Sequence, residues 1–176
     1  MKRIISLLLA LVLCLSLCAC GGEKSADKEG GSENSEPTGS EGLEFCTYSD
    51  GTCQVTGLGA CTDTEIVIPA KYGDFKVIAI CHDAFEDCGS ITGVIISEGV
   101  VEIRSEAFQD CGKLKSVTIP NSVTRIWVGT FEGCHSLKSI YYGGTMSQWQ
   151  AINKEEGWDS GRYGYTVYCT DGKITK

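Results

Sequence analysis

The chain has 176 residues, enough for one modest domain with additional segments. It carries 23 acidic and 15 basic side chains, for a formal net charge of −8, and it has no cluster of Lys and Arg. This charge argues against nucleic acid and anionic lipid headgroups as partners, because both select for basic patches. The 22 glycines and the shortage of long apolar runs favour a turn-rich β architecture over a helical one.

Residues 1–20 have the pattern of a secretory signal peptide. Two basic residues at positions 2 and 3 precede an apolar run over 4–17. The stretch Leu17-Cys18-Ala19-Cys20, followed by two glycines, resembles the lipobox of bacterial lipoproteins. The resemblance implies cleavage before Cys20 and lipidation of that cysteine, which would anchor the exported protein on the outer side of a bacterial membrane. An ordinary signal peptide and an uncleaved anchor are the alternatives.

Residues 21–42 are predicted to be a disordered tether. They are rich in Gly, Ser and Glu, and their only apolar side chain of note is Ala26. Such a segment buries too little surface to offset the entropy lost on ordering. Its mean reach is about 25 Å, which would hold a following domain clear of the lipid headgroups.

Folded structure is predicted to begin near Leu43, and residues 43–64 are assigned to an N-terminal cap. Ser49-Asp50-Gly51 separates two β-prone runs, and Asp-Gly in that position predicts a hairpin. Cys46 and Cys53 are predicted to lie on one face of the hairpin, which leaves a disulfide between them open.

Residues 65–144 carry an internal repeat of 23 residues. Six apolar columns recur at this spacing, and Phe85, Phe108 and Phe131 form the clearest of them. A fixed period between about 20 and 29 residues, with L-x-x-V-x-I segments, is typical of leucine-rich solenoids. A single repeat cannot bury both of its faces, so the repeats are expected to stack around one core with the three phenylalanines in a single file.

Each repeat is predicted to contain two short strands. In the second full repeat these are residues 115–119 and 123–126, with a turn over 120–122 between them. A helical or 3-10 turn over 107–111 is expected before the next strand. The segment 70–76 is longer than its later equivalents, so a protruding turn is expected there.

Residues 145–176 depart from the repeat and are predicted to cover its last open face. Thr145-Met146-Ser147-Gln148 has the spacing of a capping box, which predicts a short helix. Residues 165–169 are β-prone and are expected to add one more strand to the ladder. Three apolar residues are expected to form the lid of the core: Trp149, Ile152 and Trp158.

The repeated pattern A-F-x-x-C, followed by L-x-x-V-x-I-P, resembles the BspA-type leucine-rich repeat of bacterial surface proteins. It is carried by Ala84-Phe85, Ala107-Phe108, Thr130-Phe131, Cys88, Cys111 and Cys134. The segment 144–172 is similar to the C-terminal cap of that family. The resemblance implies a curved right-handed solenoid, β-rich with short helical turns. It also implies an adhesin or surface-interaction protein without enzymatic activity.

The side chains offer little support for catalysis or metal binding. Cys88, Cys111 and Cys134 share one column, and packing as small buried hydrophobes is favoured over a disulfide or a metal site among them. Both histidines directly follow a cysteine, unlike the spaced ligands of zinc. No nucleophile-elbow motif or glycine-rich phosphate loop occurs. We therefore expect no metal, no cofactor and no enzyme activity.

The candidate binding site is a row of outward-facing residues on the concave face. In each V-x-I strand the middle residue points outward when its two neighbours point into the core. An exposed apolar to aromatic stripe is typical of a partner site, although the strand propensity of these residue types is an alternative explanation. Five residues form this row: Val67, Ile95, Thr118, Tyr141 and Tyr168.

Two functions are consistent with this pattern. We favour an adhesin-like, monomeric module that binds a protein on a host or neighbouring cell surface. The alternative is a carbohydrate-binding surface lipoprotein in which Tyr141, Tyr168 or Trp127 stacks against a sugar.

Overall fold

The computed structural model describes residues 38–161 and 164–176. The predicted signal peptide over 1–20, including Cys20, lies outside the described residues. So does most of the predicted tether, of which the structure describes only 38–42. Anchoring and tethering therefore remain predictions from sequence.

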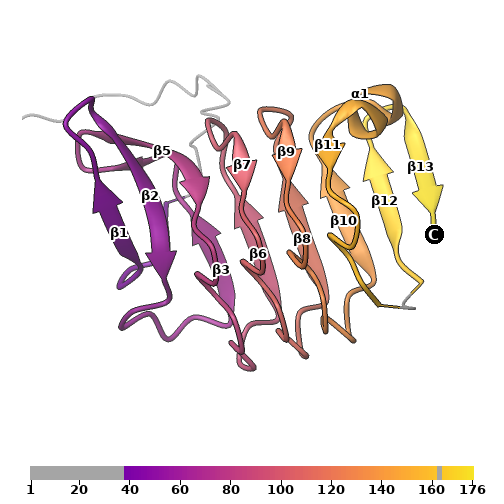
Figure 1. The fold of residues 1–176 in the computed structure, drawn as a ribbon, viewed down its shortest axis with the longest axis horizontal. Helices are drawn as coiled ribbons and strands as arrows, with labels where there is room; N and C mark the ends of the chain where they lie inside the picture. The colour runs from indigo at the N-terminus through magenta and orange to yellow at the C-terminus, as the bar shows by residue number, and fades with distance from the viewer. Residues whose placement is uncertain (1–37, 162–163) are drawn as a thin grey trace, which may run out of the picture. The chain divides into compact units, whose positions relative to one another are not determined.

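The described residues form two sheets that enclose one core, and successive turns of the chain add strands to both (Figure 1). Sheet A has the order β1-β2-β5-β7-β9-β11, with β4 paired to β5. Its strands are β1 (Glu44–Thr47), β2 (Thr52–Gly57), β4 (Lys71–Tyr72), β5 (Phe75–Ile80), β7 (Glu102–Ile103), β9 (Arg125–Ile126) and β11 (Asn153–Lys154).

Sheet B has the order β13-β12-β10-β8-β6-β3 and is parallel except for the β12–β13 pair. Its strands are β3 (Glu65–Ile68), β6 (Gly93–Ile96), β8 (Ser116–Ile119), β10 (Ser139–Tyr142), β12 (Thr166–Cys169) and β13 (Gly172–Thr175). The predicted solenoid is therefore confirmed. The second strand of each repeat is shorter than predicted, since β9 begins at Arg125 rather than at position 123.

The 23-residue period places equivalent residues directly beside one another. Val94 lies opposite Val117, and Ile103 lies opposite Ile126. Phe85, Phe108 and Phe131 form the predicted single file, with ring centroids 5.2 and 5.6 Å apart and planes within a few degrees of parallel. All three rings are buried. The shared apolar interior that a lone repeat cannot build is thus formed by stacking.

The segment predicted as a helical or 3-10 turn is a chain of tight turns instead. Residues with positive φ recur through it at the repeat spacing, and these break a regular helix. One column contains Asp83, Glu106 and Gly129, and a second contains Asp87, Asp110 and Gly133.

The predicted N-terminal hairpin is present as β1 and β2, but the predicted placement of its cysteines is wrong. Cys46 lies opposite Gln54, the residue after Cys53, so the two cysteines point to opposite faces. Cys46 is exposed, Cys53 is buried, and both are free thiols. The predicted protruding turn is also present: β4 folds back antiparallel on β5, and exposed Tyr72 stacks on Phe45.

The C-terminal cap begins with helix α1 (Met146–Ala151). Thr145 caps the helix through the predicted capping box. The backbone N–H of Gln148 donates to the Thr145 hydroxyl, and the backbone N–H of Thr145 donates to the side-chain oxygen of Gln148. Trp158 then meets the end of the phenylalanine file edge-on, 6.0 Å from Phe131. The sequence prediction missed two strands of this cap, β11 and β13.

Candidate functional site

The five residues predicted as an outward row lie in register across sheet B. Val67 is opposite Ile95, Ile95 is opposite Thr118, and Tyr141 lies between Thr118 and Tyr168. Ile95, Tyr141 and Tyr168 are 40%, 47% and 42% exposed, while Val67 and Thr118 are half-buried. We call this set the outer row. Whether it binds a partner stays a prediction.

Strand alternation is the reason that these side chains point outward. The residue before each of them belongs to the buried core, which forces the next side chain to the other side of the pleat. These preceding core residues are Ile66, Val94, Val117, Ile140 and Val167.

Two aromatic rings form the most exposed part of the outer row. Tyr141 and Tyr168 stack with ring centroids 5.3 Å apart and planes 19° from parallel. Lys173 of β13 lies opposite Tyr168 and extends the row by one exposed cation. Sequence reasoning missed Lys173 because it ended the ladder at Cys169. The signal was the stretch Thr170-Asp171-Gly172, in which Thr170 and Asp171 form a two-residue turn and Gly172 begins β13 opposite Cys169.

A hollow of about 230 Å³ adjoins the outer row on sheet B. It exists because small or compact residues occupy the positions where the neighbouring turns meet: Ser97, Pro120 and Gly143 follow the ends of three adjacent strands. Ile95 and Thr118 of the outer row form part of its wall, and Glu98 adds one carboxylate. We call this the sheet B hollow. Its lining is mostly apolar, which suits an inserted aliphatic or aromatic side chain.

Trp127 does not share a face with the two tyrosines, contrary to the prediction that grouped them. It directly follows β9 of sheet A, and its amide donates to the carbonyl of Ile103 on the neighbouring strand. The sequence already indicated that they lie on different sheets, because Trp127 follows the second strand of its repeat whereas Tyr141 lies in a first strand.

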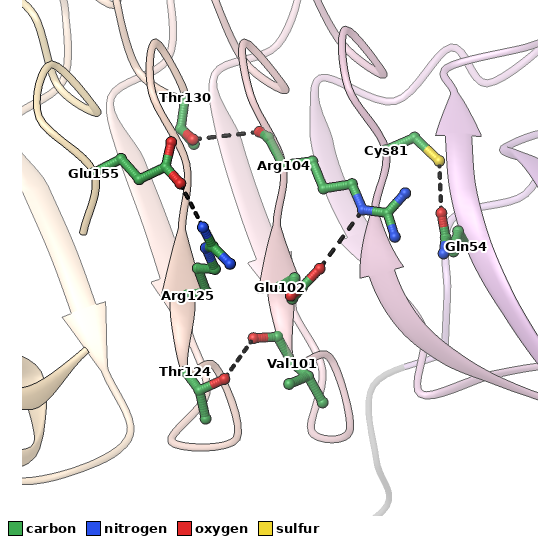
Figure 2. A network of polar contacts seen from close by, with 9 residues as sticks. All are labelled: Gln54, Cys81, Val101, Glu102, Arg104, Thr124, Arg125, Thr130 and Glu155. Atoms are coloured by element: carbon green, nitrogen blue, oxygen red, sulfur yellow. Dashed lines mark hydrogen bonds and ion pairs between the residues drawn. The ribbon is translucent and has the colours of Figure 1, made fainter. Parts of the chain in front are cut away.

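The outer face of sheet A carries several polar side chains, and one ion pair and several hydrogen bonds join neighbouring turns there (Figure 2). Arg125 donates to Glu155 at 2.7 Å, and the guanidinium carbon of Arg125 lies 3.6 Å from the centre of the Trp127 ring. Arg104 and Glu102 approach to 3.7 Å. Farther along, the Cys81 thiol donates to the Gln54 side chain at 3.1 Å.

Two members of the cysteine column, Cys111 and Cys134, are buried in the core, and the third, Cys88, is half-buried against it. The thiols of Cys111 and Cys134 donate to the carbonyls of Phe85 and Phe108, each at 3.1 Å. Burial raises the pKa of the Cys111 thiol, with a smaller contribution from neighbouring Cys134, and raises the pKa of Cys134 to about 12. Such thiols stay protonated and are poor nucleophiles. Every cysteine in the described residues is a free thiol.

The turns of two neighbouring repeats bring together three potential metal-ligating side chains that the sequence analysis did not identify. His82, Asp83 and Glu106 offer ligand atoms within 4.8 Å of one another. The imidazole places Nδ1 2.9 Å from the Ser105 carbonyl and Nε2 2.8 Å from the Asp83 carboxylate. All three side chains are open to water, and their mutual contacts account for the arrangement without an ion.

The described residues contain no helix with the length and hydropathy needed to cross a membrane.

Comparison with known proteins identifies the repeat. The model of the BspA type leucine rich repeat region matches residues 60–153 in six copies, which is more than half of the chain. A search of curated proteins found no match.

Solved bacterial proteins are similar to this chain. A leucine-rich repeat protein from Bacteroides ovatus is 32% identical, with a TM-score of 0.51 over 64% of this chain and 32% of that protein. One from Bacteroides capillosus is 26% identical, with a TM-score of 0.45 over 64% of this chain and all of that protein. A leucine rich cell surface protein from Faecalibacterium prausnitzii is 22% identical, with a TM-score of 0.36. The chain thus spans about a third of the Bacteroides ovatus protein.

Proposed function

Because the chain belongs to the BspA-type leucine-rich repeat family, we propose that it is a lipid-anchored, adhesin-like module that binds proteins at the cell surface. The observation that carries this proposal is the outer row with its adjoining hollow. Together they form an exposed apolar surface on a rigid parallel sheet, and such patches mark interaction sites on soluble domains. Extended surfaces built from stacked repeats are what solenoid proteins use for binding.

The internal repeat separates folding from recognition. Core columns keep the same residue character from turn to turn, as in Val94, Val117 and Ile140. The outer row changes from Ile95 to Thr118 to Tyr141 over the same turns. Stacking therefore constrains the inward residues and leaves the outward ones free to be selected for a partner.

The contacts of His82 do not place it to activate a serine hydroxyl. His82 directs one ring nitrogen to the Ser105 backbone carbonyl and the other to the Asp83 carboxylate. The most buried thiols are held protonated. These contacts support binding, rather than chemistry, as the function.

The test of partner binding uses the full chain displayed on a heterologous bacterium. Binding of purified host matrix proteins and of surface proteins from neighbouring bacteria is measured by flow cytometry. We expect at least one protein of the panel to bind, and Tyr141→Ala with Tyr168→Ala to weaken it by about tenfold or more, since large aromatics dominate such interfaces.

The matched control for that experiment is Arg104→Gln, a change of similar exposure on the outer face of sheet A. It should leave the binding of the protein partner unchanged. Binding that survives loss of both tyrosines, or a panel in which no protein binds, would refute the proposed site.

Anchoring is supported by the signal peptide and by the lipobox resemblance around Cys20. Cells grown with labelled palmitate should incorporate the label into the wild-type chain and place the chain in the membrane fraction. Cys20→Ala should lose both properties, whereas Cys18→Ala, two positions away, should keep them. Equal labelling of the two variants would contradict lipidation at Cys20.

A further inference from the structure

The outer face of sheet A holds a second cavity that the proposed protein-binding surface does not use. It has a volume of about 320 Å³, and five side chains line it: His82, Glu102, Arg104, Ser105 and Trp127. This volume is at the lower end of small-ligand sites. We call it the sheet A cavity.

The aromatic wall of this cavity is held in place before any ligand arrives. Glu155 accepts a 2.7 Å hydrogen bond from Arg125, and its other oxygen accepts from the Val128 amide at 3.4 Å. Arg125 in turn lies 3.6 Å over the Trp127 ring. Because Arg125 covers one face of the indole, Trp127 presents its other face or its edge to the cavity. A clamped ring loses little entropy on binding.

The polar wall offers donors and acceptors side by side. The Arg104 and Glu102 side chains approach to 3.7 Å, which is too long for a hydrogen bond between them. They are 39% and 32% exposed, so both remain accessible. A guanidinium fork next to a carboxylate matches a pair of neighbouring hydroxyl groups, because each hydroxyl can accept from the one and donate to the other.

The surrounding charges disfavour an anionic ligand. Glu102 lines the cavity, and the carboxylates of Asp83 and Glu106 gather around His82 at its rim. The whole chain carries a net charge of −8. Acidic saccharides and phosphates would be repelled by this field, whereas a neutral polyol would not.

Folding does not require these outward residues. The inward residues that precede them are identical in three consecutive turns: Ile80, Ile103 and Ile126. The outward positions at the same spacing carry three unlike side chains: Cys81, Arg104 and Trp127. Because the repeats accept all three side chains at this position, stacking of the repeats does not explain why a tryptophan lies beside an arginine.

We propose that the sheet A cavity binds a neutral hexose unit of a glycan. The apolar surface of the Trp127 indole packs against the C–H face of the sugar. The Glu102–Arg104 pair binds two adjacent hydroxyl groups, and Ser105 and His82 complete the polar wall. This site is separate from the outer row of sheet B, so the two proposals stand or fall independently.

The test is saturation-transfer NMR on the purified full chain with four probes: maltotriose, cellotriose, mannotriose and triacetylchitotriose. At least one should receive saturation from the protein. Its affinity should fall by about tenfold or more in Arg104→Gln, since a charge-assisted bond to a hydroxyl is lost. Trp127→Ala should lower the affinity further, and the control Tyr141→Ala should leave it unchanged.

Arg104→Gln is the decisive variant, because the Arg104 side chain is 39% exposed and its ion pair with Glu102 is long, so its replacement should leave the Tm unchanged. The proposal is overturned if none of the four probes binds, or if binding persists in Arg104→Gln. Loss of binding in Tyr141→Ala overturns it as well, since that result would place the sugar on sheet B. Preference for an oligoglucuronate over all four probes would overturn the neutral assignment.

Discussion

At the residue scale, the core cysteines show how a small side chain serves two purposes. Cys111 and Cys134 are buried among the apolar side chains of the core, and each thiol also donates to a carbonyl of the preceding turn. The packing role was predicted from their common column. The hydrogen bond was not, because it depends on how the turns stack.

Burial of these thiols makes the fold sensitive to alkali. The pKa of Cys134 is about 12 in the folded chain against an ordinary 9.0, and that of Cys111 is raised as well. Below about pH 9 both states keep the proton, so their full contribution to stability is present. Above it only the unfolded chain ionises, and the free energy of unfolding should fall by about 1.4 kcal/mol per pH unit and per thiol.

Denaturant unfolding measured at several pH values between about 8 and 10 checks this expectation. Cys111→Ala and Cys134→Ala together should make the alkaline decline shallower while lowering stability at neutral pH through lost packing. A smaller decline should remain, because burial also raises the pKa values of four other thiols, those of Cys53, Cys81, Cys88 and Cys169. Tyr165, whose pKa burial also raises, ionises in the unfolded chain only above about pH 10. A wild-type stability that is constant over this range would show that the thiols are not buried as described.

At the element scale, the turns between the two sheets are shaped by contacts to the next repeat. The amides of Phe85 and Asp87 donate to carbonyls of the following turn, at Ala107 and Gln109. The intervening amide of Glu86 donates three residues back, to Asp83. A helix would send every amide along its own axis, so this alternation is incompatible with the predicted helical turn.

The glycine in one positive-φ column provides a test of this geometry. At Gly133, φ is 70°, and an added Cβ would lie 1.9 Å from the Asp110 carboxylate and 3.0 Å from its Cα. Gly133→Ala should therefore lower the free energy of unfolding by about 2–4 kcal/mol, through strain and overpacking. Thermal or denaturant unfolding measures the difference.

Gly112→Ala is the matched control for Gly133→Ala. A Cβ at Gly112 meets no atom within 4 Å, and the next repeat has His135 at the equivalent position. Its stability should stay within about 0.5 kcal/mol of wild type. Equal losses in the two variants would contradict the clash with Asp110.

At the scale of the whole folded unit, stability depends on two features: successive repeats must keep the 23-residue register, and the two ends of the solenoid must be capped. At one end of sheet B, Ser40 pairs with Val67 through its amide at 2.9 Å and its hydroxyl at 3.0 Å. At the other, Trp158 covers the last phenylalanine and β13 adds an antiparallel strand. Covered ends protect a solenoid from pairing edge to edge with another chain.

Removal of one whole repeat should be tolerated when the phase is kept. Deleting residues 108–130 joins Ala107 to Phe131 and leaves every column in register, because the period is 23 residues. We expect this shortened chain to fold, with a cooperative but lower Tm, since repeat stabilities add along the stack. Circular dichroism with thermal unfolding is the measurement.

Deletion of residues 108–127 is the control for the repeat deletion. It removes fewer residues but shifts every later column by three positions, which turns core side chains to the surface. This variant should lose the cooperative transition. The stacking account fails if it unfolds as cooperatively as the chain that keeps the phase.

The sequence by itself determined the period, the core columns, the N-terminal hairpin, the capping helix and the outward direction of the outer row. All of these follow from short-range alternation and from one spacing repeated along the chain, as with Phe85, Phe108 and Phe131. The capping box at Thr145 could be predicted for the same reason, since its two partners are three residues apart in the sequence.

Only the tertiary structure decided which outward residues share a surface. It separated Trp127 from Tyr141, placed Cys46 and Cys53 on opposite faces, and added Lys173 to the end of the row. The physical reason is that these outcomes depend on how strands pair, including strands that follow one another in a hairpin. Such pairing is set by register, by a bulge in the pairing of β2 with β5, and by amides that bond to the next turn rather than along their own.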